Sequence, residues 1–204
     1  MGNILSGAIS HDDGTTGAIY EHIVSIATAL VRQRRDLVVT SLPHLSAILS
    51  RLLEILRTVR LDLGARQRRS VTDTLPSWIN PALPLGTDNA KSLARLLTSL
   101  TTKSVVRVLP SRADPTGKAQ SLTQPFSKHA PYVLTAYLRA LSDPLCQFLP
   151  SIRRELEPGL FALCDMMGEH GRDSIMAAML DGGGRTMLKI LWKEYEKQRY
   201  TGKG

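Results

Sequence analysis

Apolar residues recur at helical spacing through most of this chain, and short segments rich in Pro, Gly or polar residues separate the recurrences. The clearest stripe runs from about Pro43 to Leu61, where Leu, Ile and Val recur every three or four positions. Arg51, Glu54 and Arg57 lie opposite this stripe, as expected for an exposed helix face. The pattern predicts an amphipathic helix that buries its leucine face in a core.

The same reasoning predicts further helices. Two long ones span about 17–35 and 89–101. The last third of the chain is predicted as shorter helices that begin near Pro131, at Asp143-Pro144 and at Glu157-Pro158, because Pro suits the first turn of a helix. Two more helices span about 173–180 and 185–199, and Pro150 marks a kink or a restart.

These elements predict an all-α fold. We expect antiparallel helical hairpins that pack as a helical-repeat-like (armadillo/HEAT-like) terminal domain. Residues 1–16 are polar and predicted to be disordered, whereas 17–204 are expected to form a single all-helical domain. Two long basic loops are expected at about 64–88 and 110–127, and the run 105–109 is ambiguous between an extended piece and a helix.

The charge of the chain indicates polyanionic surroundings. Lys and Arg number 26 against 18 acids, which gives a net charge of +8. Such an excess favours contact with RNA, phosphate-rich surfaces or acidic proteins. The closing helix carries cations four residues apart, which form a slowly turning basic ridge that is either a contact surface or a plain solvated face. The candidate contact residues are Arg185, Lys189, Lys193 and Lys197 in the ridge, and Arg66, Arg68, Arg69, Arg112 and Lys118 in the loops.

Patterns typical of catalysis are missing from the sequence. His and Cys show no metal-ligand spacing, and no nucleophile elbow, Walker loop or dinucleotide fingerprint occurs. The Gly-rich run after Asp181 follows no strand and lacks a Gly-Lys-Ser/Thr ending, so we interpret it as a tight turn rather than a phosphate loop. We therefore expect a protein that is not an enzyme and has no cofactor, metal or small-molecule substrate.

Two cysteines and the N-terminus bear on the compartment. Cys146 and Cys164 lie in apolar helical patterns and are expected to be buried free thiols. No apolar run approaches the roughly 18 residues of a membrane span, so no membrane partner is expected. The first six residues fit the N-myristoylation pattern, with Gly2 as the acceptor.

Packing and turn motifs of this chain resemble the C-terminal domain of nucleolar pre-rRNA-processing proteins of the Urb/Npa type. The resemblance covers the chain from about Gly17 and is strongest after Lys128. The residues that carry it are Lys128-His-Ala-Pro-Tyr132, Leu156-Glu-Pro-Gly-Leu-Phe-Ala-Leu-Cys-Asp165, Gly184-Arg185, Lys189, Tyr195, Lys197 and the upstream Ser41-Leu-Pro43.

The resemblance implies a nuclear, nucleolar scaffold that acts early in assembly of the large ribosomal subunit and in pre-rRNA processing. It also implies partners among the pre-ribosomal assembly factors: another scaffold of the same pathway, a DEAD-box helicase and small accessory proteins. The basic loops and the ridge are then expected to contact either pre-rRNA or acidic protein partners. This chain is short and looks like the end of such a protein. An alternative hypothesis is a soluble helical-repeat adaptor outside the nucleolus, N-myristoylated at Gly2.

Overall fold

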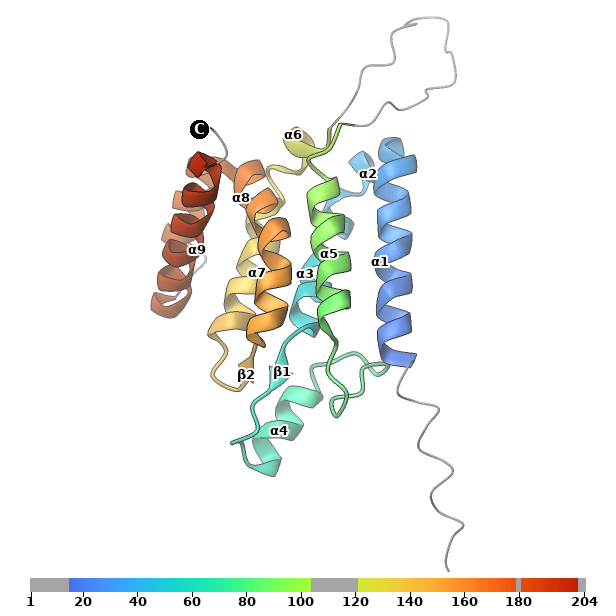
Figure 1. Ribbon diagram of the computed structural model, residues 1–204, viewed down its shortest axis with the longest axis vertical. Helices are drawn as coiled ribbons and strands as arrows, with labels where there is room; N and C mark the ends of the chain where they lie inside the picture. The colour runs from blue at the N-terminus through green and yellow to red at the C-terminus, as the bar shows by residue number, and fades with distance from the viewer. Residues whose placement is uncertain (1–14, 104–120, 179–180, 202–204) are drawn as a thin grey trace, which may run out of the picture.

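Helices account for most of the chain in the computed structural model, which describes residues 15–103, 121–178 and 181–201 (Figure 1). The all-α prediction is confirmed, and the strands in the described part are two short ones that pair with each other. The elements are α1 Thr15–Gln33, α2 Arg35–Thr40, α3 Leu42–Ile55, β1 Thr58–Val59, α4 Ala65–Thr72, α5 Thr87–Ser99, α6 Thr123–Phe126, α7 Ala130–Ser142, β2 Cys146–Gln147, α8 Pro150–Ala178 and α9 Gly182–Thr201.

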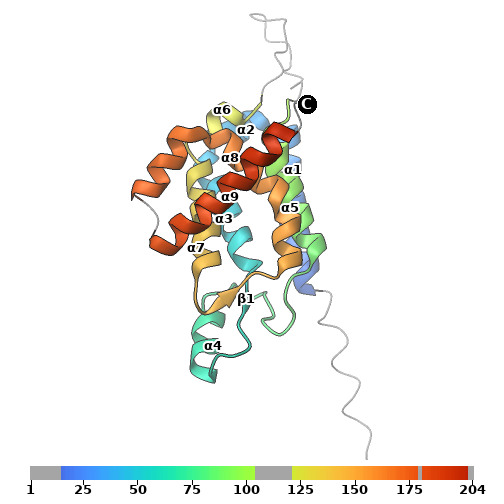
Figure 2. The ribbon, with the colours of Figure 1, turned by 60° about the vertical axis from the view of Figure 1, so that its left-hand side comes forward.

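The long helices pack side by side around a leucine-rich core. α5 lies between α1 and α8, α3 packs on α7, and α7 also packs on α8 (Figure 1). α9 covers the α7–α8 side of the molecule, as both ribbon views show (Figure 2). The residues at the centre are fully buried, among them Leu93, Leu97, Leu134, Leu138 and Leu163. Burial of these leucines is the main source of stability for such a fold.

The order of packing differs from a stack of successive hairpins. α1 lies against α5 and α3 lies against α7, so both α1 and α3 have their largest contact with a helix distant in sequence. α1 and α3 do touch, because the buried Tyr20 hydroxyl donates to the Leu52 carbonyl at 3.1 Å. The helical-repeat-like arrangement expected from the sequence is therefore not confirmed.

The helix expected to begin at Asp143-Pro144 does not exist, and this prediction was wrong. The chain instead forms β2, which pairs antiparallel with β1, so that Val59 lies opposite Cys146. The Asp143 carboxylate accepts a hydrogen bond from the Leu145 amide at 2.9 Å and pairs with Arg57 at 3.1 Å. These bonds turn the chain after α7. The helix predicted to reach Leu61 also ends earlier, at Ile55, because the chain enters β1.

α8 combines three segments that the sequence suggested were separate. Pro150 begins the helix, so it marks a restart and not a kink. Pro158 was expected at a helix start but lies inside α8. The chain turns at Gly168, which has a φ of 66°, a left-handed conformation that favours glycine. α8 therefore consists of two helical arms that meet at Gly168.

α9 begins earlier than predicted because Asp181 caps it. The Asp181 carboxylate accepts a hydrogen bond from the Gly184 amide at 2.7 Å, so the Gly-rich run forms the first turn of the helix. Leu188, Trp192 and Tyr195 face inward and are buried.

Candidate polyanion-contact surfaces

The predicted basic ridge lies on the outer face of α9. Arg185, Lys189, Lys193 and Lys197 are all exposed, because burial of the opposite face against α7 and α8 turns them outward. The side chains of the three lysines form no hydrogen bond or ion pair within the residues that the structure describes. Their charges are therefore available to an external partner.

A hydrogen bond from Tyr195 attaches α9 to α8 beneath the ridge, and Trp192 makes a second hydrogen bond within α9 itself. The Tyr195 hydroxyl donates to Asp165 of α8 at 3.0 Å, and the Trp192 indole N–H donates to Glu196 at 2.8 Å. Burial, the hydrogen bond to Asp165 and the charge of that carboxylate raise the pKa of Tyr195 to about 12. The hydroxyl therefore stays protonated and keeps its donor role at neutral pH.

The second arm of α8 brings another cation beside the ridge. The Arg172 guanidinium lies 5.0 Å from the centre of the Trp192 ring, within cation–π range. Arg172 also pairs with Asp173 at 2.9 Å. Together with Lys189 and Lys193 these side chains line a surface hollow of about 340 Å³. The ridge thus borders a concave feature whose lining also includes the carboxylate of Glu196.

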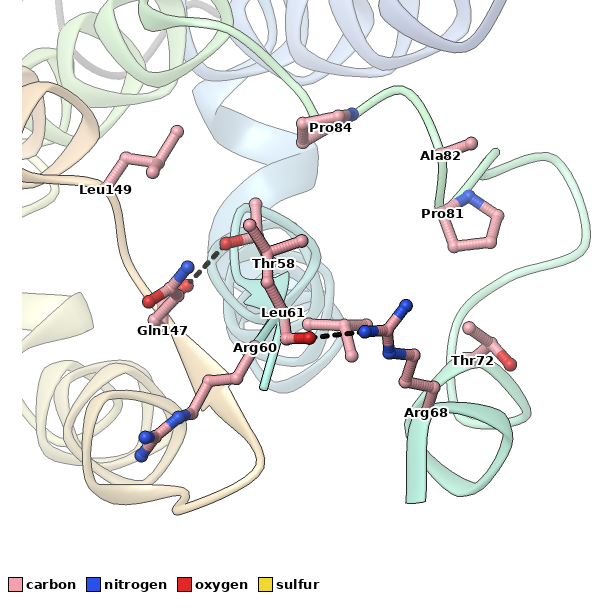
Figure 3. Close-up of a pocket in the computed structure, with 11 residues that line it drawn as sticks. Thr58, Arg60, Leu61, Arg68, Thr72, Pro81, Ala82, Pro84, Gln147 and Leu149 are labelled. Carbon is pink, nitrogen blue, oxygen red and sulfur yellow. Dashed lines mark hydrogen bonds between the residues drawn. The ribbon is translucent and has the colours of Figure 1, made fainter. Parts of the chain in front are cut away.

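The three arginines predicted to lie in the first basic loop lie in α4, a helix that the sequence interpretation missed. Arg66, Arg68 and Arg69 are all exposed. Arg68 is committed to local structure, because its guanidinium donates to the carbonyl of Leu61 (Figure 3) and, at 2.9 Å, to that of Leu63. Arg66 and Arg69 remain candidate contact residues.

The pocket in Figure 3 lies between β1, α4 and the Pro-rich connection, and has a volume of about 480 Å³. Its two arginines are already engaged, since Arg60 pairs with Asp62 at 2.8 Å and Arg68 bonds carbonyl groups. Leu61, Pro81 and Pro84 add an apolar lining. The pocket therefore offers little free positive charge for a polyanion.

The structure does not bring the predicted contact residues together. α4 lies at one end of the molecule beside β1, whereas α9 covers the α7–α8 flank, as both ribbon views show (Figures 1 and 2). Arg112 and Lys118 lie outside the described residues, as do Gly2 and the ambiguous run 105–109.

A third basic surface was not among the predicted sites. Arg32 at the end of α1, Lys91 and Arg95 on α5, and Glu155 on α8 line a hollow of about 410 Å³. None of these four side chains forms an ion pair or hydrogen bond in the described parts of the chain. The signal in the sequence was the four-residue spacing of Lys91 and Arg95, but only the packing of α1 and α8 on α5 adds Arg32 and Glu155.

Buried Arg35 adds positive charge directly behind this hollow, which we call the basic hollow. Its guanidinium donates to the carbonyls of Val31 at 3.0 Å and Ser99 at 3.5 Å, and Ser99 also lines the hollow. Desolvation lowers the pKa of Arg35 from its ordinary value. Four cations thus surround or underlie the basic hollow, against the single carboxylate of Glu155.

The two cysteines are buried and free, as expected. Burial raises the pKa of Cys146 to about 11 and that of Cys164 to about 12, so both thiols stay protonated at neutral pH. Within the described ranges, no group of His, Cys, Asp and Glu is arranged to hold a metal ion. Among the helices described, none has the length and apolar character needed to cross a membrane.

The fold and its surfaces define an all-helical protein with exposed basic faces on a leucine-rich core. A model of the Urb2/Npa2 family matches residues 1–203, and the chain belongs to that family. This membership implies a nuclear role in ribosome biogenesis and pre-rRNA processing, and it does not support the alternative of an adaptor outside the nucleolus. No curated protein and no solved structure matched the chain.

Proposed function

We propose that this chain is a non-enzymatic scaffold module that acts in the nucleolus during early assembly of the large ribosomal subunit. Its leucine core supplies a rigid body, and its cationic surfaces hold the phosphate backbone of pre-rRNA. The partners suggested by the family are another scaffold protein of the pathway and a DEAD-box helicase. The observation that carries the proposal is the family membership, combined with the exposed cations Lys189, Lys193, Arg32, Lys91 and Arg95, whose side chains have no partner among the described residues.

Two surfaces are proposed to share the RNA contact. The ridge presents Lys189, Lys193 and Lys197 along one outer face of α9, where like charges four residues apart repel one another. The basic hollow concentrates Arg32, Lys91 and Arg95 in one concave place. A polyanion relieves the repulsion on both surfaces, so we expect strong, salt-dependent and sequence-tolerant binding.

RNA affinity measured as a function of salt tests this proposal. The full chain is titrated with a single-stranded pre-rRNA fragment by fluorescence anisotropy between low and physiological salt. Each phosphate contact on a single strand contributes about 0.7 to the slope of log affinity against log salt. The combined variant Lys189→Gln, Lys193→Gln and Lys197→Gln should therefore lower the slope by about 2, with at least a tenfold loss of affinity at low salt.

A matched control removes the same charge elsewhere. Lys103, Lys128 and Arg154 are also exposed, and their combined change to Gln should leave most of the affinity and the slope intact. Equal losses in both variants would mean that net charge alone drives the binding. If the unmodified chain shows no affinity that falls with salt, the RNA part of the proposal is wrong and a role in protein contacts alone remains.

A further inference from the structure

The basic hollow contains one carboxylate among its cations. Glu155 of α8 is partly buried in the lining, and it forms no hydrogen bond or ion pair with the residues that the structure describes. In a surface that binds phosphate groups alone, a carboxylate repels the ligand, so phosphate binding does not account for its presence. A ligand that uses the whole hollow must combine negative charge with hydrogen-bond donors.

The cations of the hollow extend towards the end of α5, which lies between α1 and α8. The Asn89 amide near the start of α5 donates to Glu21 in the first half of α1 at 2.9 Å. Arg35, just after the end of α1, donates to the Ser99 carbonyl at the end of α5. The two helices therefore run in the same direction. Arg32 lies in the last turn of α1, so it stands at the end of the hollow where α5 ends.

The carboxylate lies towards the other end of the hollow. α8 packs closely on α5, since a Cβ added at Gly159 would lie 2.9 Å from the backbone of Ala94. Both helices run away from the β-strand end of the molecule (Figure 1). Glu155, one turn before Gly159, is therefore level with Lys91, which precedes Ala94 by nearly one turn. Arg95 follows one turn further along α5. The hollow thus presents its carboxylate at one end and a line of cations that leads to the other.

An unpaired guanosine nucleotide carries the groups that match this order of charges. The Watson–Crick edge of guanine has two neighbouring donors, N1–H and N2–H, which suit the two acceptor oxygens of a carboxylate. Adenine and cytosine place a ring-nitrogen acceptor beside their amino group, and uracil places N3–H between two carbonyl groups. The phosphates on either side of the nucleotide accept from Lys and Arg. The volume of about 410 Å³ also lies within the usual range for a small-molecule site, about 300–1,000 Å³.

We propose that the basic hollow binds an unpaired guanosine of RNA. Glu155 accepts hydrogen bonds from N1–H and N2–H of the base, and Arg95 and Arg32 hold the neighbouring phosphates. This inference rests on the proposed function, because it adds a base preference at one place to an RNA contact that is otherwise sequence-tolerant. In a duplex the same two donors are engaged by cytosine, so the preference applies to single-stranded RNA.

Short oligouridines with one variable central nucleotide test the base preference by fluorescence anisotropy. The protein is the full chain with Lys189→Gln, Lys193→Gln and Lys197→Gln, so that the hollow dominates the binding. Guanosine at the centre should bind roughly fivefold more tightly than adenosine, or better. Inosine, which keeps N1–H but lacks the N2 amino group, should fall between the two. Equal affinity for all central nucleotides would overturn the inference.

The variant Glu155→Gln separates base recognition from a structural role. It should abolish the guanosine preference, whereas the affinity for plain oligouridine should stay the same or rise, because a negative charge near the phosphates is removed. The matched control is Glu157→Gln on the same helix, which lines a different cavity, between α7, α8 and α9, and should keep the preference. An equal loss of affinity for every oligonucleotide in Glu155→Gln, or an undiminished preference, would overturn the inference.

Association with pre-ribosomal particles, measured by sedimentation of nuclear extract, distinguishes this inference from the proposed function. If the chain enters particles and binds RNA without a guanosine preference, the inference is wrong and the scaffold role stands. If the preference depends on Glu155 but the chain never enters particles, the inference stands and the scaffold role is wrong. A chain that binds none of the oligonucleotides overturns both the inference and the RNA part of the proposed function.

Discussion

The interface between α5 and α8 and the interface between α8 and α9 are built from different chemistry. At the first, leucines and small residues meet closely: a Cβ added at Gly159 would lie 2.9 Å from the backbone of Ala94 and 2.9 Å from Leu97. At the second, aromatic residues end in polar groups, and Tyr195 reaches Asp165 by a hydrogen bond. The first interface determines the fold, whereas the second attaches a helix whose outer face remains available for contact.

The largest difference between the two interfaces should appear when a buried leucine is truncated. Leu97 is fully buried, so Leu97→Ala leaves a cavity and should lower the free energy of unfolding by about 2–5 kcal/mol. Ile190→Ala on α9 is the control, and it should cost less than about 1 kcal/mol because this side chain is half exposed. Urea unfolding measures both. Equal losses of unfolding free energy in the two variants would contradict the proposed difference between the two interfaces.

A glycine pair tests the close approach directly. Gly159→Ala should lower the free energy of unfolding by about 1–3 kcal/mol, since the new methyl group forces α5 and α8 apart. Gly182→Ala at the start of α9 meets no atom within 4 Å, so it should change stability by no more than a gain of about 1 kcal/mol. If thermal unfolding shows that Gly159→Ala lowers stability whereas Gly182→Ala raises it, the close contact at Gly159 is supported. Stabilisation by both variants would contradict that contact.

The hydrogen bond that attaches α9 should contribute less. Tyr195→Phe should cost about 1 kcal/mol at neutral pH, because Asp165 is exposed and regains water. Folding raises the pKa of Tyr195 to about 12 from the ordinary 10.0, so its stabilising effect is complete below pH 10 and is lost as pH rises towards 12. The stability difference between the protein and the variant should therefore shrink between pH 9 and pH 12 in urea unfolding. A constant difference would show that Tyr195 does not titrate in this way.

Removal of the ridge charges should have the smallest effect on stability. Lys189→Gln with Lys193→Gln removes a like-charge pair at four-residue spacing, so unfolding should be unchanged or harder by no more than about 0.5 kcal/mol. Thermal unfolding at low salt gives the clearest comparison. A loss above about 1 kcal/mol would show that the lysines hold α9 in place, and it would weaken their assignment to a contact surface.

Elements that depend on short sequence patterns could be predicted from the sequence. The leucine stripe of α3 and the basic ridge of α9 could be predicted because helical spacing is a property of short stretches of sequence. The strand β2 could not be predicted from the sequence, because Asp followed by Pro is an ordinary start for a helix and Asp143-Pro144 fits that pattern. The partner strand β1 and the ion pair with Arg57, both distant in sequence, favour the extended path.

Among the contact surfaces, too, only the one confined to a single helix could be predicted from the sequence. The ridge follows from one helix, so its residues could be chosen from the sequence, whereas the basic hollow needs α1, α5 and α8 to meet. Arg68 appeared equivalent to Arg66 and Arg69 in the sequence, but the path of the chain after β1 commits it to two carbonyl groups.

We propose that cations on the outer face of α9 and in the basic hollow hold pre-rRNA. The most direct measurement is ultraviolet crosslinking in cells, followed by sequencing of the bound RNA, for the protein and for the ridge variant with Lys189, Lys193 and Lys197 changed to Gln. The account predicts crosslinks to pre-rRNA that fall at least fivefold in the variant, while the variant remains folded and nuclear. Undiminished crosslinking of the variant, or a protein that crosslinks no pre-rRNA, would contradict it.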